Sequence, residues 1–290
     1  MNINKIIIAL SFVKGIGKVK TKKIFSGLQN FNLTEKEFSD HLKQENLIKE
    51  DDLVFFNQYL NKAEKILEKT VNEGIKVISF IDEEFPEHLK NIPNPPIQLF
   101  TKGNTTKLNN LNKSVAIIGT RNPEEGSKKN AFEIAEKLAQ QNYIIVSGLA
   151  KGCDTAAHEG CIKSNGSTVA VLPSNLHNIY PKNNTQLVEK IIESEGCLVS
   201  EYFFGQETQD HNFVERDRLQ SGLACTVVLI QSNIKGGSMH TINFAKKQNR
   251  SICAMKPLDD RNFLGNKKII DEGLASEFSS YSELKIISFI

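Results

Sequence analysis

The chain lacks tryptophan, has only three methionines, and contains no apolar run close to the about 20 residues that a membrane-spanning helix requires. Its opening apolar run is short and leads into a lysine-rich stretch, not a small-residue cleavage site, so we interpret residues 1–12 as part of a first helix and not as a signal peptide. These absences argue against a membrane or secreted protein, and we expect a cytoplasmic one.

Cysteine is sparse and scattered. The five cysteines form no C-x-x-C pair and have no histidine at ligand spacing, which argues against a zinc site and against a disulfide framework. Their neighbours are small or apolar, as is typical of reduced and partly buried thiols. No base is apparent for a catalytic cysteine, and we expect no metal and no cofactor. The five are Cys153, Cys161, Cys197, Cys225 and Cys253.

A strong excess of charge of one sign is also missing. The formal net charge of the 290 residues is +2. Residues 1–112 carry 16 basic and 14 acidic side chains, and residues 113–290 carry 20 of each. Binding of a polyanion must therefore depend on a local, shaped site and not on bulk attraction. The length leaves room for two domains.

Residues 1–75 have a helical pattern. Within them, residues 12–24 (FVKGIGKVKTKKI) resemble a helix-hairpin-helix turn, in which glycines free backbone N–H groups to meet a phosphate. The alternative is an ordinary helix–turn–helix with solvated lysines. Residues 76–113 predict a short connecting strand, an acidic turn, a proline-rich crossing and a polar loop or hairpin, because Pro93, Pro95 and Pro96 exclude regular structure.

Residues 114–290 alternate strand and helix. Each gap between strands has the length of a helix, which predicts right-handed crossovers and a mostly parallel sheet with helices on both faces. The apolar end, residues 278–290, is expected to pack onto the sheet or a partner. The expected strands are Val115–Ile118, Tyr143–Val146, Thr168–Leu172, Leu198–Ser200, Cys225–Ile230 and Ser251–Ala254.

Two glycine-rich turns follow the first two of these strands, at the edge where ligands bind open α/β sheets. Gly119, Thr120 and Arg121 suit a nest of N–H groups and a guanidinium fork around a phosphate. The turn lacks the later glycines of a dinucleotide fingerprint, and a structural turn with a salt-bridged arginine is the alternative. The second turn carries Lys151.

Further polar segments are expected near the same edge. Asp154 and His158, four residues apart on one helix, could form a catalytic pair, although no nucleophile is assigned. Tyr180 and Lys182 suit stacked bases and phosphates of single-stranded nucleic acid, or else simple loop packing. Arg216 and Arg218 should point differently, one toward the site and the other toward solvent or Glu215. A last glycine-rich turn holds Gly236, Gly237, Ser238 and His240, of which the histidine alone is weak evidence for catalysis.

Six segments in this order resemble the DNA-processing protein A family (DprA, also called Smf). Residues 81–103 also look like that family, so the resemblance extends from about Phe12 to Gly273. The segments are VAIIGTRNP, IVSGLAKGCDTAAHEG, GSTVAVLPSNLHNIYPKNN, GCLVSEYFFG, FVERDRLQSGLA and KGGSMHT.

The resemblance implies a Rossmann-like domain behind a small sterile-alpha-motif or helix-hairpin-helix-like domain, here residues 1–75, with a connecting segment 76–113 and the sheet domain 114–290. It implies a homodimer that binds single-stranded DNA, protects it, and loads the recombinase RecA during natural transformation, without catalysis. No C-terminal winged helix is expected. By motif match the phosphate-binding and DNA-binding positions are Gly119, Thr120, Arg121, Lys151, Lys182, Asn183, Arg216, Arg218, Gly236, Gly237 and Ser238.

Several residues depart from the family pattern. Val214 and Asp217 replace the proline and asparagine of the arginine segment, and Gln231 replaces a common acid. An acid between two arginines could weaken their pull on a phosphate. Two other functions stay open: a nucleotide-hydrolysing enzyme of the lysine-decarboxylase-like group, which Lys235–Thr241 fits poorly, and a nucleotide sensor.

Overall fold

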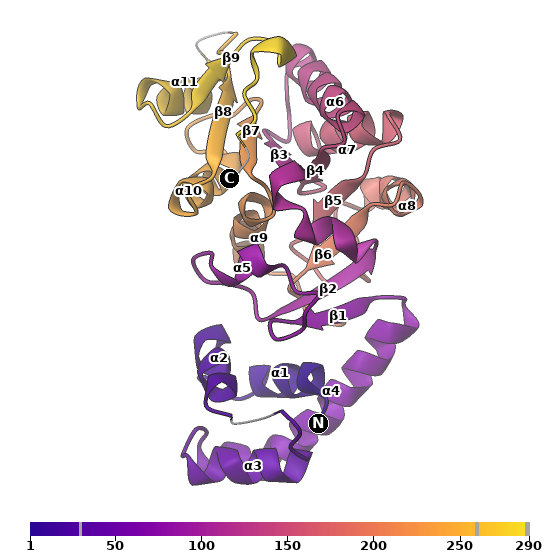
Figure 1. The fold of residues 1–290 in the computed structure, drawn as a ribbon, viewed down its shortest axis with the longest axis vertical. Coiled ribbons are helices and arrows are strands. Elements are labelled where there is room, and N and C mark those ends of the chain that lie inside the picture. Colours follow the sequence, from indigo (N-terminus) through magenta and orange to yellow (C-terminus); the bar gives the residue numbers. More distant parts are fainter. Residues whose placement is uncertain (29–30, 259–260, 288–290) are drawn as a thin grey trace.

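The computed structural model describes residues 1–28, 31–258 and 261–287. The N-terminal part of the chain, up to Asn72, is helical, as predicted, and forms a bundle below the sheet in Figure 1. The Asn2 side chain caps the first helix, and Thr34 and Glu37 form a reciprocal capping box at the third. The four helices are α1 (Ile3–Ser11), α2 (Lys18–Ser26), α3 (Glu35–Gln44) and α4 (Glu50–Asn72).

The remaining described chain is built around a nine-stranded sheet. Its order is β1-β2-β6-β5-β4-β3-β7-β8-β9, and every pair from β6 to β9 is parallel. All six predicted strands are present, and each differs from its predicted range by one residue at one or both ends. They could be predicted because strands buried on both faces are apolar throughout. They are β3 (Ser114–Ile118), β4 (Ile144–Ser147), β5 (Thr168–Val171), β6 (Cys197–Ser200), β7 (Thr226–Leu229) and β8 (Ser251–Met255).

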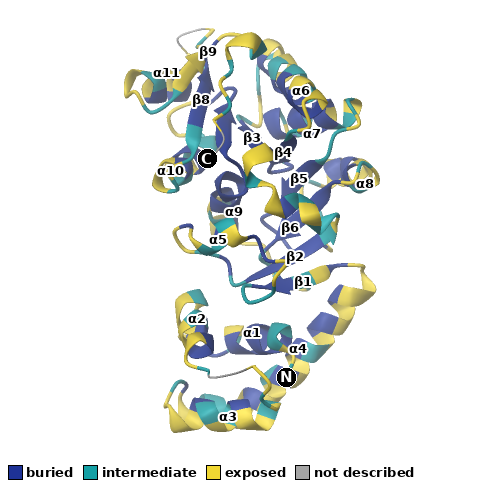
Figure 2. Cartoon of the chain, viewed as in Figure 1, coloured by how far each residue is buried: buried dark blue, intermediate teal, exposed yellow. Residues whose placement is uncertain are grey.

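Helices cover both faces of this sheet, as predicted, and Figure 2 shows the strands buried between helices with exposed outer sides. On one face α6 and α7 pack over Val115 and Ile117. On the other face α9, α10 and α11 pack over Ala116 and Ile118. The helices are α6 (Glu125–Gln140), α7 (Cys153–Lys163), α8 (Thr185–Glu193), α9 (Asp210–Gly222), α10 (Ser238–Lys247) and α11 (Leu264–Asp271).

The segment before residue 114 contributes two antiparallel strands to the sheet. The predicted strand is β1 (Lys76–Ser79), and after the short helix α5 (Glu87–Lys90) a second strand, β2 (Gln98–Gly103), pairs with β6. Strand β2 was not predicted, because its pairing partner β6 lies about a hundred residues later and the preceding prolines obscure its strand pattern. Residues 104–113, predicted as a loop or hairpin, form two 3₁₀ turns. The domain limits themselves stay a prediction.

The helical bundle sits directly on the β1–β2 edge of the sheet (Figure 1). The Gln98 side chain donates to the Asn4 backbone oxygen at 3.1 Å, and Asn4 donates to the Val77 oxygen. One hydrophobic cluster contains residues of the bundle together with Phe100 and residues of α8. The two parts of the chain therefore share a core.

The C-terminal segment was predicted to pack onto the sheet or a partner, and its described residues, 278–287, pack onto the sheet. After α11, β9 (Ser276–Phe278) pairs with β8, and Phe278 is buried against Met255 and the α6 side of the core. Residues 288–290 of the predicted apolar tail lie outside the described residues. In the part of the chain that the structure describes, no helix is both long and apolar enough to cross a bilayer.

Candidate nucleic-acid interface

The strand order reverses between β3 and β7. The chain moves from β3 through β4 and β5 to β6, and then returns to place β7 on the other side of β3. Ligands of open α/β sheets bind outside the carboxyl ends of the strands at such a switch point. A hollow of about 430 Å³ lies there. Its lining includes the predicted Gly119, Thr120, Arg121, Arg216, Gly236, Gly237 and Ser238.

The two predicted glycine turns lie against each other at this edge. The Cys153 N–H donates to the Thr120 oxygen at 3.2 Å. A Cβ on Gly152, which has φ +82°, would lie 2.5 Å from that same oxygen, and a Cβ on Gly119 would lie 2.4 Å from the Cys153 Sγ. Only glycine permits this approach at either position. The first turn and the second turn therefore form one wall.

Arg121 extends from this wall over an aromatic ring. Its guanidinium carbon lies 5.4 Å from the Phe213 ring centroid, and the Tyr180 ring meets Phe213 edge-on at 5.7 Å. Arg121 and Tyr180 are exposed. Phe213 lines the switch-point hollow and also a second hollow of about 660 Å³ that contains Tyr180 and Lys182. The row Arg121–Phe213–Tyr180 thus connects two hollows.

The floor of the switch-point hollow is a buried charge cluster. The Arg216 Nη1 donates to the Gly148 oxygen at 2.5 Å and the Val171 oxygen at 2.6 Å, and its Nε bonds the Asp217 carboxylate at 3.1 Å. The Asp154 carboxylate accepts the Gly148 N–H at 3.1 Å. Arg216 therefore holds the ends of β4 and β5 in place and is only 6% exposed.

Burial favours the protonated form of the two acids in this cluster, Asp217 and Asp154. It raises the pKa of Asp217 to about 6, against the opposing effect of Arg216. It also raises the pKa of Asp154, again opposed by Arg216. One arginine therefore faces two carboxylates, and the floor itself gives little attraction for a phosphate when both are ionised.

Arg218, predicted beside Arg216 as a DNA contact, does not reach the hollow. Residues two apart on a helix point in nearly opposite directions, so Arg218 leaves α9 on its other side. It is 1% exposed, and its Nη2 lies 2.7 Å and 2.6 Å from the two oxygens of Glu201. The expectation that one arginine would point toward Glu215 fits this position, since Arg218 Nε lies 3.7 Å from Glu215.

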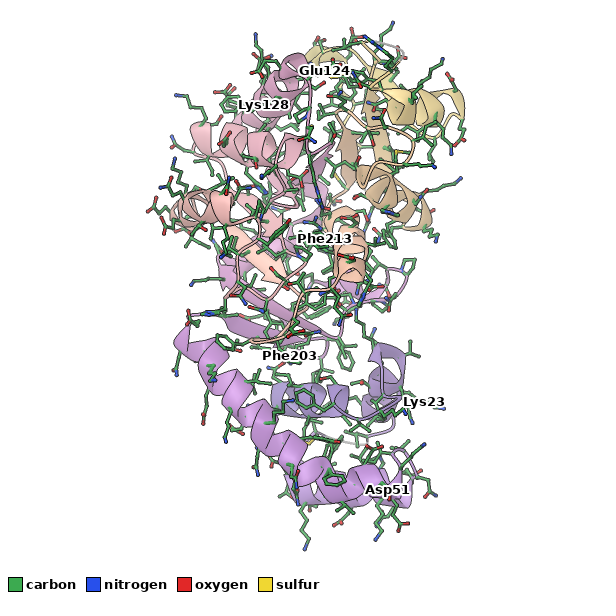
Figure 3. The ribbon with its side chains drawn as sticks, turned by 180° about the vertical axis from the view of Figure 1, so that it is seen from behind. Lys23, Asp51, Glu124, Lys128, Phe203 and Phe213 are labelled. Atoms are coloured by element: carbon green, nitrogen blue, oxygen red, sulfur yellow. The ribbon has the colours of Figure 1, made fainter. Side chains whose placement is uncertain are left out.

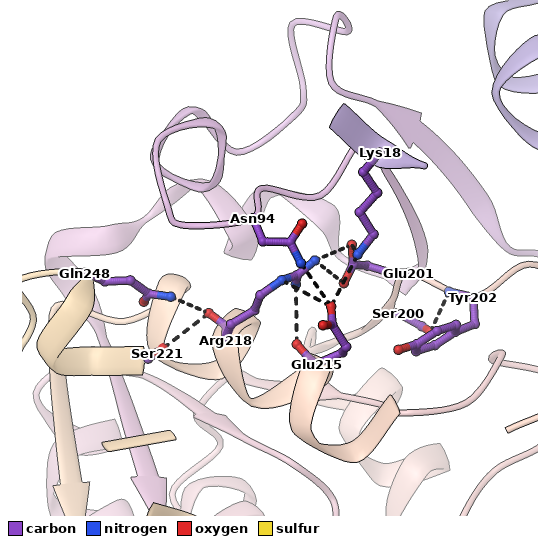
Figure 4. A network of polar contacts seen from close by, with 9 residues as sticks. All are labelled: Lys18, Asn94, Ser200, Glu201, Tyr202, Glu215, Arg218, Ser221 and Gln248. Carbon is purple, nitrogen blue, oxygen red and sulfur yellow. Dashed lines mark hydrogen bonds and ion pairs between the residues drawn. The ribbon is translucent and has the colours of Figure 1, made fainter. Parts of the chain in front are cut away.

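The surrounding network joins the sheet to the helical bundle (Figure 4). Lys18 of α2 lies 2.9 Å from Glu201 and 3.6 Å from Glu215. Burial alone would raise the pKa of Glu201, but Arg218 and Lys18 outweigh it and lower that pKa. This lysine belongs to the predicted helix-hairpin-helix turn, and it contacts carboxylates of the sheet part.

The remaining predicted contact residues are Lys151, Lys182, Asn183 and Ser238. Lys151 and Asn183 are exposed, and neither is among the described residues that line the two hollows. Lys182 lines the second hollow. The Ser238 hydroxyl donates to Ser232 at 2.8 Å, so it steadies the turn after β7.

The conceivable catalytic pair is not formed. His158 is fully buried and its Nδ1 lies 2.7 Å from the Thr168 hydroxyl, whereas Asp154 faces the turn before its helix. Burial lowers the pKa of His158 to about 3. All five cysteines are unpaired and buried, and burial raises the pKa of Cys153 to about 12. No cluster of His, Cys, Asp or Glu in the described chain is arranged to hold a metal.

Three further residues shape the site, and their roles were not predicted from the sequence. Phe213, the shared residue of both hollows, was quoted only as part of a motif. Asn184 is buried and donates to the Leu149 oxygen at 2.8 Å, which ties the Tyr180 loop to the second glycine turn. Gln231, noted as a departure, accepts the Glu124 N–H at 2.9 Å and so fixes the loop after Arg121. An asparagine or glutamine in a loop gives no signal of such a contact in the sequence.

Comparison with known proteins gives consistent matches. A family model described as DNA recombination-mediator protein A matches residues 76–287. The DNA processing protein DprA of Bacillus subtilis is 33% identical over 224 residues, which are 77% of this chain and 75% of that protein. The protein Smf of Synechocystis sp. is 32% identical over 259 residues, which are 86% of this chain and 63% of that protein.

Two solved structures are also similar. The X-ray structure of DNA processing protein A from Streptococcus pneumoniae superposes with a TM-score of 0.80 at 26% identity and covers 99% of this chain and 96% of that one. A structure that addresses the single-stranded DNA binding mode of DNA processing protein A from Helicobacter pylori has a TM-score of 0.65 at 29% identity, over 72% of this chain and 92% of that one. The first match includes the helical bundle as well as the sheet.

Proposed function

The chain belongs to the DNA recombination-mediator protein A family, and from that premise we propose that it binds single-stranded DNA across the two hollows beside β3 and β7. The observation that carries the proposal is the row Arg121–Phe213–Tyr180, which connects the hollows. The Helicobacter pylori relative, whose structure concerns single-stranded DNA binding, supports it.

The chemistry of the row fits a flexible strand better than a duplex. Arg121 and the N–H groups of the adjoining turn offer donors to a phosphate, and Lys182 offers a second cation. Phe213 and Tyr180 offer ring surfaces to bases, which only an unpaired strand can present. Because stacking tolerates every base, we propose binding with little sequence preference.

We propose further that the protein protects this DNA and loads a RecA-type recombinase onto it, in natural transformation or recombination, as a cytoplasmic homodimer. The C-terminal segment and the strands near it are the proposed dimer contact. Light scattering should give twice the mass of one chain at micromolar concentration. A monomer there would contradict the dimer but not the DNA binding.

The central test compares a single-stranded with a double-stranded oligonucleotide of the same sequence, at several salt concentrations. We expect preference for the single strand and a linear fall of log affinity with log salt. Equal affinity for both, or no binding to either at low salt, would contradict the proposal.

We propose binding without catalysis, because Asp154, Asp217 and His158 are engaged in structural contacts. Incubation with nucleoside monophosphates tests the enzyme alternative, and release of free base would overturn our proposal. Calorimetric titration tests the sensor alternative. A nucleotide sensor would bind a mononucleotide more tightly than an oligonucleotide, and we expect the reverse.

A further inference from the structure

A third hollow, of about 500 Å³, lies where the long helix α4 meets the loop after β6. Three lysines of α4 line it on one side and aromatic residues on the other. No acidic side chain of the described chain lines it. Its lysines are Lys62, Lys65 and Lys69, and its aromatic residues are Phe12, Phe203 and Phe204.

Two of the three lysines lie near aromatic rings of this hollow. The Lys62 Nζ lies 4.0 Å from the Phe12 ring centroid, and the Lys69 Nζ lies 5.8 Å from that of Phe204. All three lysines are exposed. Their spacing of three and four residues places them on one face of α4, along roughly 10 Å of helix. The surface is a short track of cations beside rings.

This track adjoins the proposed DNA site. The His177 ring, which lines the second hollow, lies 4.6 Å from the Phe204 ring of the third. The first and second hollows share Phe213. In Figure 3, Phe203 lies below Phe213, at the level where the sheet meets the helical bundle. The three hollows therefore form a series from the sheet edge to α4.

An acidic residue also lies where the second and third hollows meet. Glu73, just after α4, is 3.4 Å from His177 Nδ1, and both side chains are nearly half exposed. The acidic neighbours of the lysines on α4 are Glu64, which lies 2.6 Å from Lys5, and Glu68, which is exposed and does not line the third hollow. The lining of the third hollow therefore has three lysines and no acid among the described residues.

We propose that a single strand bound in the sheet hollows continues across His177 and Phe204 onto the lysine face of α4, so that the helical bundle holds a second segment of the same strand. This inference rests on the proposed function. A strand of phosphates and bases matches alternating cations and rings, whereas an acidic protein surface would match the lysines alone.

The test uses the full chain with two lengths of oligothymidine. One has roughly 6 nucleotides and fits the sheet hollows, and the other has about 16, the upper end of the range of site sizes for one single-strand-binding module. The variant K62Q/K65Q/K69Q keeps most of each side chain. Its matched control is K163Q/K190Q/K246Q, in the last turns of α7, α8 and α10, at the opposite edge of the sheet.

We expect the variant to bind the long strand at least about tenfold more weakly in moderate salt, with a salt slope lower by about 2, since each lost phosphate contact removes about 0.7. Its affinity for the short strand should stay at the wild-type value, and the control should match the wild type for both. The charge-keeping variant K62R/K65R/K69R should recover long-strand binding.

Two results would overturn the inference while the proposed function stands. In the first, the glutamine variant binds the long strand with the affinity and salt slope of the wild type. In the second, the variant loses the same amount of affinity for both strand lengths. The second would mean that α4 does not hold a separate segment. If the wild type binds neither strand, the proposed function fails as well.

Discussion

The Arg121 guanidinium lies 5.4 Å above the ring of Phe213, although the two residues are 92 positions apart and come from different elements. The first follows β3 and the second lies in the first turns of α9. Their contact closes the gap between the turn that we propose to bind phosphate and the aromatic side of the site. The pair therefore places a cation over an aromatic ring, an arrangement that suits the phosphate and base of a single-stranded nucleotide.

Replacing either partner should weaken binding of single-stranded DNA in a different way. Arg121→Ala should lower the salt slope by about 0.7, the loss of one phosphate contact. Phe213→Leu should leave the slope unchanged and cost about 1–3 kcal/mol of affinity, the usual range for one stacked base. Fluorescence anisotropy over a salt series measures both. Lys190→Ala, in the last turn of α8, is the control. Unchanged affinity in both variants would contradict the assignment of this row.

Much of this architecture could be predicted because its residues repeat a simple pattern. Uniformly apolar strands and glycines at strand ends predicted the parallel sheet and the position of both glycine turns. The contacts between distant segments could not be predicted in this way. Strand β2 depends on pairing with β6, and Phe213 acts only because α9 brings it to Arg121.

The two arginines of α9 illustrate the same limit. The sequence places Arg216 and Arg218 two residues apart, and helical geometry predicts that they point apart. It does not say which side is the ligand side. The answer depends on Glu201, which follows β6 and pairs with Arg218 at the junction with the helical bundle.

Replacing Asp217 by asparagine should change the pH dependence of stability. The folded-state pKa of Asp217 is about 6, against 3.8 for an unperturbed aspartate carboxyl, so ionising Asp217 costs the folded state up to roughly 3 kcal/mol. That cost is absent below pH 4, grows between pH 4 and 6, and is complete above. Asp217→Asn should therefore unfold at higher urea than the wild type at pH 7 and match it near pH 4. A residual slope should remain from Asp154, whose pKa is also raised.

The same change should raise affinity for single-stranded DNA at pH 7 by a few fold, because it removes one negative charge from the floor of the site. The wild type should gain affinity between pH 7 and 5 and the variant much less. His240 also lines the hollow, so His240→Gln is the control. Parallel pH profiles of wild type and Asp217→Asn would contradict a role for Asp217.

Removing the Arg218 side chain should lower the stability of the fold and should not remove a contact with DNA. Arg218→Ala leaves the buried Glu201 without its main partner, which typically costs about 3–5 kcal/mol. Lys18→Ala removes a partly exposed partner of the same carboxylate and should cost under about 1 kcal/mol. Urea unfolding measures both. An Arg218→Ala protein of wild-type stability that had lost DNA binding would show that Arg218 contacts DNA after all.

Gly152→Ala should damage both stability and DNA binding, because this glycine sets the distance between the two glycine turns. Its φ of +82° and ψ of −122° lie in a region that is essentially restricted to glycine, at a cost of about 1–3 kcal/mol for another residue. The new Cβ would also lie 2.5 Å from the Thr120 oxygen and 2.7 Å from the Arg121 oxygen, and must push the phosphate-facing turn away. Gly273→Ala is the matched control, since its φ is +65° and no atom lies within 4 Å of the added Cβ. If backbone strain alone mattered, both variants would lose similar stability and keep DNA affinity. We expect instead that only Gly152→Ala weakens DNA binding, when the two variants are compared well below their unfolding temperatures. The reason is that the backbone displaced by Gly152→Ala carries Arg121, whereas Gly273→Ala displaces no neighbouring backbone.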